Sequence, residues 1–484
     1  MGGMQLVATG FAGASEGVRT YVGSFTNSAP TSAVAIESLP AGAARKAAAY
    51  AASASVTGSA MADAAPQLEA LRERGLITGY RTYAATGMIA IDVPESQAAA
   101  GWDAINQVAH TGKFVRSREF TLAGAVDAVA GAALAAPTSA FAPPAVVPRV
   151  ATRSVGAVRA EDVWRTNHTG AGVVVGILDT GVDGTHSFLA SSYRGARAGG
   201  SPVQDYNWYD AFGLAARPVD DHSHGTHVTG IVVGRGTMLD QGASVPLTTG
   251  VAPGAKWIAA RMMSSKMSAT TEQTLAAVNW MLAPTDAQGR NADPTKAPDI
   301  VNSSWSFTDE DPRPYQLAFD AMRRAGIVSI VAAGNAGPGA RTIGDLGSFP
   351  SNITVAATDG AGSAADFSSR GPGRQDLPGL GISKPDIAAP GVAVFSSTPG
   401  NALGTKSGTS MAAPVAAGIA ALVLGKYPTL TPAQVRLVLE RSGADLGPAG
   451  RDSTYGAGRI DAVRAMAAAD ALVGARSRSV ASVA

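Results

Sequence analysis

Three short, glycine-containing motifs between residues 179 and 414 limit the possible folds of the chain most strongly. They contain Asp179, His224 and Ser410, in the sequences Asp-Thr-Gly, His-Gly-Thr-His and Gly-Thr-Ser-Met-Ala-Ala-Pro. An acid, a base and a nucleophile are the three groups of a serine hydrolase triad, and their order along the chain separates the unrelated folds that carry this triad. Each motif matches at several positions, including a glycine. The chance that one chain contains all three is therefore far smaller than the chance that it contains any one of them.

The residues around the motifs predict where the fold places them. Asp179 ends the apolar run 173–179, which is typical of a buried parallel strand. The carboxyl ends of such strands are where open α/β sheets carry their sites. Ser410 begins an apolar, helix-prone stretch with Pro414 in its first turn, where proline is tolerated. The positive end of that helix favours the negative charge that develops during acyl transfer.

Apolar runs that alternate with helical patterns predict a parallel sheet covered on both faces. Further strands are expected at 256–262, 298–305, 326–333 and 352–358. Helices are expected at 271–282, 315–325, 410–427 and 432–442.

The three motifs resemble those of the subtilisin-like serine proteases, the subtilases, and the likeness runs from about Val155 to Ala471. It implies an α/β fold of three layers with a mostly parallel sheet flanked by helices. It also implies that Ser410 is the nucleophile, His224 the base and Asp179 the group that orients and stabilises the imidazolium. The implied activity is that of a serine endopeptidase working through an acyl-enzyme intermediate.

A fourth stretch, Ala-Ala-Gly-Asn-Ala-Gly at 332–337, resembles the oxyanion loop of the family and makes Asn335 the expected donor to the tetrahedral oxygen. Asparagine at this position separates the chain from the sedolisins, which use an acidic residue. The residues that would form the two walls of the substrate groove are Ser304, Trp305, Ser306, Ala332, Ala333 and Gly334. Many relatives carry glycine in place of Ser306, so its hydroxyl either narrows the pocket or lies on its rim. We expect the pocket to take apolar or medium-sized side chains.

Each candidate residue also has an ordinary structural interpretation. Alone, Asp179 fits a turn, Ser410 a helix cap, Asn335 a left-handed turn and Trp305 a core position. The joint match of the triad and the oxyanion residue favours catalysis. Two alternatives stay open: a peptide ligase or cyclase in which an amine resolves the acyl-enzyme, and a catalytically silent binding protein. No sequence feature supports the first, and the second usually lacks one of the four residues present here.

The composition restricts other functions. The formal net charge is +1 over 484 residues with no Lys/Arg run, which gives no argument for a nucleic-acid partner. The chain contains no cysteine, so disulfides and thiol chemistry are excluded. No apolar stretch approaches the roughly 20 residues that span a membrane. We therefore expect a monomer that acts on protein or peptide substrates.

We expect no cofactor for catalysis, and the family likeness leaves a structural calcium ion open. The acidic residues that fall in one loop region are Asp205, Asp210, Asp220 and Asp221. Their spacing forms no regular calcium-binding loop, so no metal ligands are assigned.

Residues 17–121 predict a separate, smaller α+β domain. Its expected elements are a strand at 18–25, an alanine-rich helix at 41–74, a hairpin at 77–93, a helix at 95–110 and a strand at 113–120. This order resembles the propeptide that precedes many subtilase domains and acts as an intramolecular chaperone and inhibitor until it is cleaved. An unrelated accessory domain is the alternative.

The remaining boundaries follow from composition. Residues 122–153, rich in Ala, Pro and Ser, predict an extended linker in which the zymogen is cut, and 154–472 form the catalytic domain. We expect residues 473–484 to be a disordered tail. Residues 1–16 stay unassigned, because they lack a basic segment and make a poor signal peptide. The family likeness favours an extracellular protein, with another export route, a truncated start or an intracellular location as alternatives.

Overall fold

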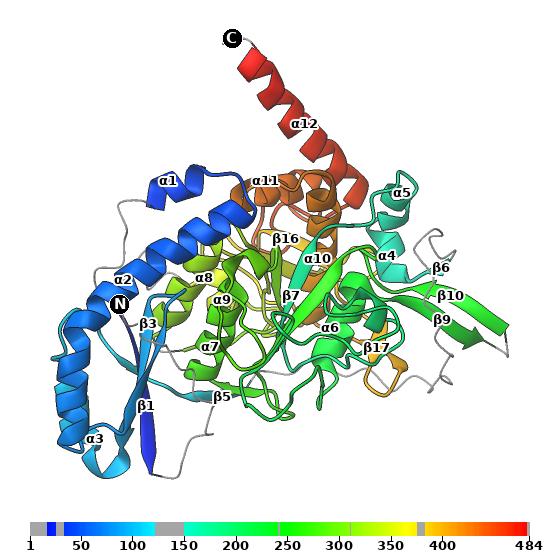
Figure 1. Cartoon of the computed structure of the whole chain (residues 1–484). Coiled ribbons are helices and arrows are strands. Elements are labelled where there is room, and N and C mark those ends of the chain that lie inside the picture. Colours follow the sequence, from blue (N-terminus) through cyan, green and yellow to red (C-terminus); the bar gives the residue numbers. More distant parts are fainter. Residues whose placement is uncertain are drawn as a thin grey trace.

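The computed structural model describes residues 17–25, 33–121, 150–240, 243–309, 311–374 and 383–481. Two bodies lie side by side (Figure 1): a large one from residue 150 onward and a small one before residue 122. Three parts of the predicted organisation lie outside the described residues: the unassigned segment 1–16, most of the linker 122–153 and the last residues of the tail, 482–484.

The large body is built on a seven-stranded sheet with the order β16-β15-β14-β13-β7-β11-β8, in which every neighbouring pair is parallel. Its strands are β7 (Val174–Asp179), β8 (Trp208–Asp210), β11 (Lys256–Arg261), β13 (Ile300–Ser303), β14 (Val328–Ala332), β15 (Ile353–Thr358) and β16 (Ile387–Pro390). The predicted α/β class with a parallel sheet is confirmed, although β8 and β16 were not among the predicted strands.

Helices cover both faces of this sheet because its strands are apolar on both sides. Val175 and Ile177 belong to one core cluster and Leu178 to a second, since neighbouring residues of a strand point to opposite faces. The helices on the first face are α4 (Arg153–Ala157), α5 (Ala160–Trp164), α6 (His224–Val233), α10 (Thr409–Lys426), α11 (Pro432–Ser442) and α12 (Ala462–Ala481). Those on the second face are α7 (Thr271–Leu282) and α8 (Arg313–Ala325).

Local signals explain why several helix boundaries match the predictions. Thr270 and Gln273 form a capping box at the start of α7, and Thr431 and Gln434 form another at the start of α11. Gly326 ends α8 with φ 83°, a left-handed conformation that glycine adopts without strain. These interactions are local, so the sequence reveals them directly.

Helix α10 lies in the centre of the core. Of the helices in the described part of the chain, it alone is long and apolar enough to cross a membrane, and 89% of it is buried within the fold. Burial of that extent is the environment of a core helix. The remaining elements of the large body are η2 (Ala190–Ser192), η3 (Pro294–Lys296), α9 (Asp345–Ser348), β6 (Val150–Ala151), β9 (Arg235–Asp240), β10 (Ala243–Thr248), β12 (Ser268–Thr270), β17 (Val394–Thr398) and β18 (Ala402–Lys406).

The small body is a four-stranded antiparallel sheet with helices packed on it. The sheet has the order β2-β3-β1-β4, and its core includes Phe25, Leu68, Ile89 and Phe114. Its elements are β1 (Val18–Ser24), α1 (Ala33–Ser38), α2 (Ala43–Glu73), β2 (Gly79–Tyr83), β3 (Met88–Pro94), η1 (Glu95–Gln97), α3 (Ala98–Ile105) and β4 (Val115–Arg116). The expected last strand is split, and its second part, β5 (Glu119–Thr121), pairs with β12 of the large body.

Two boundary expectations are wrong. The tail expected to be disordered from residue 473 continues α12 to Ala481, since its alanines and arginines favour a helix. Figure 1 shows the end of this helix projecting from the body. Residues 150–153, which were assigned to the linker, belong to the large body, because β6 pairs in parallel with residues 247–248 of β10 and α4 begins at Arg153.

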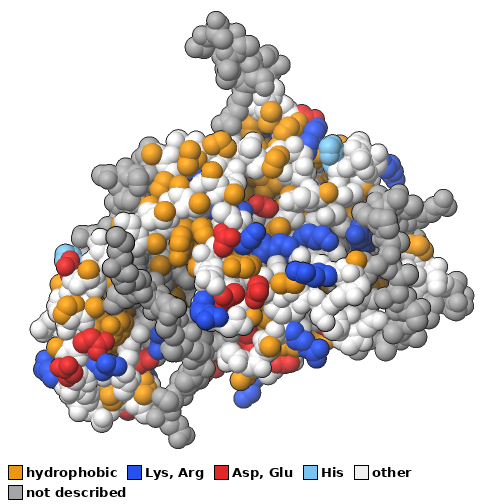
Figure 2. All heavy atoms as spheres, viewed as in Figure 1, with side chains coloured by type: hydrophobic (Ala, Val, Ile, Leu, Met, Phe, Trp, Pro, Cys, Tyr) orange, Lys and Arg blue, Asp and Glu red, His pale blue; other side chains and the backbone are white. Residues whose placement is uncertain are grey.

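The surface has no predominant charge on the face that Figure 2 shows. Lys and Arg side chains lie beside Asp and Glu side chains, with apolar side chains between them. This mixture is what the balanced composition of the chain leads us to expect.

Candidate active site

Asp179 and His224 form a buried pair at the carboxyl edge of the sheet. Asp179 is the last residue of β7, and His224 is the first residue of α6. Nδ1 of His224 lies 2.8 Å from Oδ1 of Asp179, and the two side chains are 1% and 0% exposed. A carboxylate at Nδ1 holds the imidazole in the tautomer that leaves Nε2 as a proton acceptor. The predicted acid and base therefore meet.

A glycine of the second motif allows this approach. A Cβ atom on Gly225 would lie 2.1 Å from the carbonyl oxygen of Gly181, so the two motifs touch through their backbones. The Gly225 N–H donates to the hydroxyl of Thr180 at 2.9 Å, which links the motifs a second time. Gly225 is thus a steric requirement of the Asp179–His224 contact.

Asp220 connects the same two motifs through their threonine side chains. Its carboxylate accepts hydrogen bonds from the Thr180 hydroxyl at 2.9 Å and from the Thr226 hydroxyl at 2.6 Å. Sequence reasoning considered Asp220 only as a possible calcium ligand and missed this role. The threonines that follow Asp179 and His224 in their motifs were the available signal.

Ser410 lies in the first turn of α10 and is 5% exposed. Its hydroxyl donates to the carbonyl oxygen of Ser304 at 2.8 Å, and the Ser304 hydroxyl donates to the Ser410 carbonyl oxygen at 2.8 Å. Nε2 of His224 is buried and makes no hydrogen bond with the described residues. Catalytic hydrogen bonds often form only when substrate is bound. The structure thus brings Asp179 to His224 and directs the Ser410 hydroxyl to Ser304.

Asn335 follows β14 and is oriented by the residue before the serine. Its Oδ1 accepts hydrogen bonds from the backbone N–H and the hydroxyl of Thr409, both at 2.9 Å. Because two donors hold the oxygen, Nδ2 points away from Thr409. The N–H of Ser410 belongs to the first turn of α10, where backbone donors lack intrahelical acceptors. Asn335 and Ser410 line the same cavity.

This cavity has a volume of about 240 Å³, and most of the predicted groove residues line it. The predicted residues that line it are Ser304, Trp305, Ser306, Ala332, Gly334, Asn335 and Ser410. Ala333 does not line the cavity. Its N–H donates to the Val355 carbonyl oxygen, and its buried side chain lies on the other side of the extended chain from the side chains of its neighbours. Trp305 is both a core and a lining residue, since it is 2% exposed and its indole donates to Leu178.

Ser306 narrows this cavity. A Cβ atom built on Gly334 would lie 3.3 Å from the Ser306 hydroxyl oxygen, and one built on Gly344 would lie 1.7 Å from it. The hydroxyl therefore fills the space between two glycines. All three residues line the cavity, so the Ser306 hydroxyl lies within its wall.

The small body reaches into the same cavity through β5. Phe120 and Thr121 are lining residues, and β5 pairs antiparallel with β12 so that Phe120 is opposite Ala269. The Phe120 ring lies 4.9 Å from that of Phe307 and 6.2 Å from that of Trp305. An extended segment paired with the edge of a groove is the geometry of β-augmentation.

The model of the subtilase family matches residues 170–458, more than half of the chain and all four predicted catalytic positions. The chain is a subtilase. The match also covers the strands and helices that carry these positions, from β7 to α10. The resemblance inferred from the motifs is therefore confirmed.

The relatives of this subtilase include three proteins of Bacillus subtilis. Bacillopeptidase F is 37% identical over 331 residues, which is 65% of this chain and 22% of that protein. Serine protease AprX is 33% identical over 334 residues, or 63% of this chain and 69% of that protein. Subtilisin E is 31% identical over 310 residues, again 63% and 69%. The subtilase thus spans about a fifth of bacillopeptidase F and about two thirds of the other two.

The four acidic residues considered for calcium do not converge in this subtilase. Asp205 accepts a hydrogen bond from the Ala287 N–H, Asp210 from three backbone N–H groups, and Asp221 pairs with Arg261 at 2.6 Å. Within the described ranges, no group of three or more His, Asp and Glu side chains could hold a metal ion. The four acids are close in the sequence, but in the fold their carboxylates are engaged by backbone N–H groups, by threonine hydroxyls and by Arg261, which contacts both Asp210 and Asp221.

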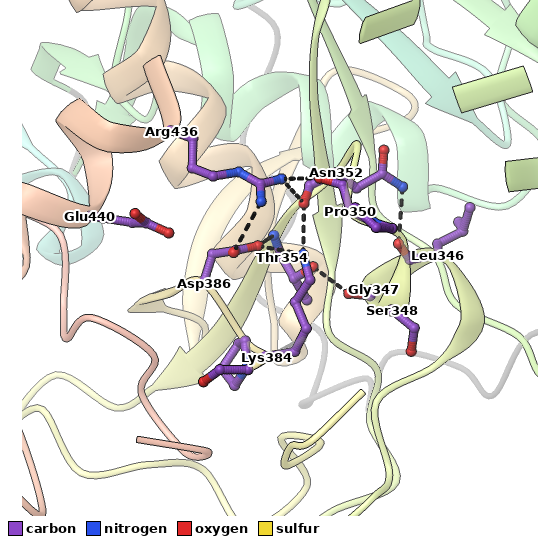
Figure 3. Close-up of polar contacts among 12 residues, drawn as sticks. Leu346, Gly347, Ser348, Pro350, Asn352, Thr354, Lys384, Asp386, Arg436 and Glu440 are labelled. Atoms are coloured by element: carbon purple, nitrogen blue, oxygen red, sulfur yellow. Dashed lines mark hydrogen bonds and ion pairs between the residues drawn. The ribbon is translucent and has the colours of Figure 1, made fainter. Parts of the chain in front are cut away.

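A buried charged cluster supports the segment behind the pocket (Figure 3). Lys384, which is 0% exposed, donates to Asp386 at 2.7 Å and to the Asn352 carbonyl oxygen at 2.8 Å. Asn352 in turn donates to the Leu346 carbonyl oxygen in α9. Burial lowers the pKa of Lys384 to about 8, against the opposing effect of Asp386. Sequence reasoning missed this cluster, whose only signal is the Lys-Pro-Asp spacing before β16.

We predict that Lys384→Met destabilises the protein by about 3–5 kcal/mol, because breaking a buried ion pair leaves a charge with less compensation. Lys426→Met is the matched control: Lys426 pairs with Asp470 on the surface, where such pairs contribute about 1 kcal/mol or less. Urea unfolding in a Ser410→Ala background, which avoids self-digestion, measures both. Equal losses in the two variants would contradict the role of the cluster.

We also predict that His227 makes the fold sensitive to acid. Burial lowers its pKa to about 3, so the folded state keeps it neutral while an unfolded chain takes up a proton below about 6.5. Its contribution is complete above pH 6.5 and is lost as the pH falls towards 3, by at most about 1.4 kcal/mol per pH unit. Thermal midpoints between pH 7 and 4 should fall less in His227→Gln than in the parent. Equal falls of the thermal midpoint in His227→Gln and in the parent would contradict this role.

Proposed function

We propose that this subtilase is a serine endopeptidase that forms an acyl-enzyme on Ser410. The observation that carries the proposal is the buried Asp179–His224 contact, which provides an oriented base. Helices α6 and α10, which hold His224 and Ser410 in their first turns, pack against each other. The four motif matches and the serine protease relatives support the same activity.

In the proposed reaction, the Ser410 hydroxyl turns from the Ser304 carbonyl towards Nε2 of His224. Its oxygen attacks the scissile carbonyl carbon while its proton passes to His224. Asp179 stabilises the imidazolium, which then protonates the leaving amine. Water repeats the sequence on the acyl-enzyme and releases Ser410. Nδ2 of Asn335 and the backbone N–H of Ser410 stabilise the negative oxygen of both tetrahedral intermediates.

We further propose that the chain is a zymogen and that residues 17–121 are its propeptide. Support comes from β5, which lies in the groove where an extended substrate would pair with β12. The small sheet is also held on α7, since Arg81 and Tyr83 both contact Glu272. With β5 in place the groove cannot take another peptide. Cleavage within residues 122–149 by the enzyme itself would allow the small domain to leave.

Two expectations rest on the family likeness alone. Subtilases need no cofactor for catalysis, but a structural calcium ion is compatible with the family. A lower thermal midpoint after chelation would support such an ion. We likewise propose an extracellular site of action, which detection of the processed protein outside the cells would test.

We predict that Ser410→Ala abolishes both self-cleavage and labelling by a fluorophosphonate probe, because each needs the serine oxygen. Asn335→Ala should still be labelled but lose about 10²–10³-fold in turnover, as subtilisin does when it loses one oxyanion donor. Intact mass over time, probe labelling and peptide hydrolysis measure these effects. If the parent is not labelled even after proteolysis of the linker, the binding-protein alternative is correct. Transfer of the acyl group to an added amine in preference to water would favour the ligase.

We predict that Ser306→Gly widens the specificity pocket. The hydroxyl lies between Gly334 and Gly344, so its removal should raise kcat/KM for a substrate with Phe before the scissile bond, relative to one with Ala, by at least about tenfold. Thr308→Ala, another change at a polar lining residue, is the control and should leave the ratio unchanged. An unaltered ratio in Ser306→Gly would mean that another group limits the pocket.

A further inference from the structure

The first half of α2 contacts the large body far from the groove. This helix of 31 residues is about 46 Å long, and its N-terminal part leaves the small sheet and lies across α8 (Figure 1). Arg45 and Lys46, in its first turn, are 2% and 5% exposed. Two long cationic side chains are rarely buried to this extent unless they are paired.

Arg45 binds the end of α8. Its Nε donates to the carbonyl oxygen of Arg324 at 2.8 Å, and its Nη2 donates to that of Arg323 at 3.1 Å. These carbonyl groups belong to the last turn of a helix, where acceptors lack intrahelical donors and a positive charge is favoured. Arg45 also donates to the carbonyl oxygens of Glu37 and Leu39, which ties the chain around α1 to the same point.

Lys46 binds the edge of the central sheet. Its Nζ donates to Oδ1 of Asp299 at 2.8 Å and to the Ala297 carbonyl oxygen at 2.9 Å. Oδ2 of Asp299 accepts from the Val174 N–H, and residues 174 and 300 are the first of β7 and β13. Lys46 is therefore bound at the amino edge of the parallel sheet, opposite the carboxyl edge that carries Asp179.

Two further contacts extend this attachment. Glu37 of α1 pairs with Arg323 at 3.0 Å, and the Ala41 N–H donates to the Thr429 carbonyl oxygen at 3.4 Å. Between α2 and α8, beside Tyr50, a cavity of about 230 Å³ interrupts the packing. The attachment therefore depends on its polar contacts more than on close apolar packing.

The sequence of α2 shows that these cations do not serve the helix itself. The first turn of a helix favours acidic side chains and disfavours basic ones, and the first turn of α2 has no acidic residue. Arg45 and Lys46 are thus unfavourable in an isolated α2 and are compensated by groups of the large body. Their position is explained by docking.

We propose that residues 33–56 are a latch that holds the small domain on the catalytic body at the edge remote from the active site, and that it does so after the chain between the two has been cut. The proposal rests on the proposed processing of the zymogen. It adds a second attachment point, so that departure of β5 from the groove does not by itself release the small domain. The small domain would stay bound through the latch, and β5 could return to the groove and inhibit the enzyme again.

The test uses the full chain with Ser410→Ala and a recognition sequence for a specific protease inserted within residues 122–149. After cleavage, the dissociation rate of the two fragments is measured by dilution followed by size-exclusion chromatography. The double variant Arg45→Ala/Lys46→Met should release the small domain at least about 100-fold faster, because it loses several hydrogen bonds from charged groups. Arg72→Ala, which changes an exposed arginine on the same helix, should release it at the parent rate.

A second variant covers the case in which the double variant does not fold. Asp299→Asn leaves α2 unchanged and keeps an acceptor for the Val174 N–H, and it should speed release at least about tenfold. Higher salt should reduce the difference between this variant and the parent. Parent-like release from both folded variants would overturn the latch. Because an added protease makes the cut, absence of self-cleavage would overturn the zymogen and leave this measurement intact.

Discussion

The close backbone contact between the loop after β7 and the start of α6 is the constraint on which the site depends. It can exist only because residue 225 is a glycine, and it places His224 against Asp179. The threonines beside Gly181 and Gly225 attach to Asp220, so the pair is held by fixed hydrogen bonds. A base that is oriented before substrate arrives needs no reorganisation during the reaction.

The sequence was sufficient for features that depend on local chemistry. The strand before Asp179 and the capping boxes of α7 and α11 are each specified by a few adjacent residues, and the structure contains them near the predicted bounds. The motif residues could be assigned for the same reason, since each lies next to a turn or helix start that its own neighbours define.

Features that depend on contacts between distant segments could not be predicted. The contact of Lys384 with the Asn352 carbonyl oxygen, the contact of Asp220 with Thr180 and the position of the Ser306 hydroxyl between Gly334 and Gly344 all arise from tertiary packing. Ala333 was misplaced because a groove motif does not tell which side of an extended chain each residue faces. The helix at residues 473–481 was missed because this stretch of Ala, Arg, Ser, Val and Gly residues carries no helix signal of its own and continues a helix that begins at Ala462.

The distance along the chain between the two ends of the Lys46–Asp299 pair has a consequence for biosynthesis. The two residues are 253 positions apart, with the lysine nearer the N-terminus. A ribosome therefore releases the basic first turn of α2 well before the helix end and the carboxylate that compensate it. Until those segments emerge, this turn has no reason to stay helical, while the small sheet and the second half of α2 have their own core. Assembly would then proceed from that core towards residue 43, with the catalytic body serving as the template for the last turns.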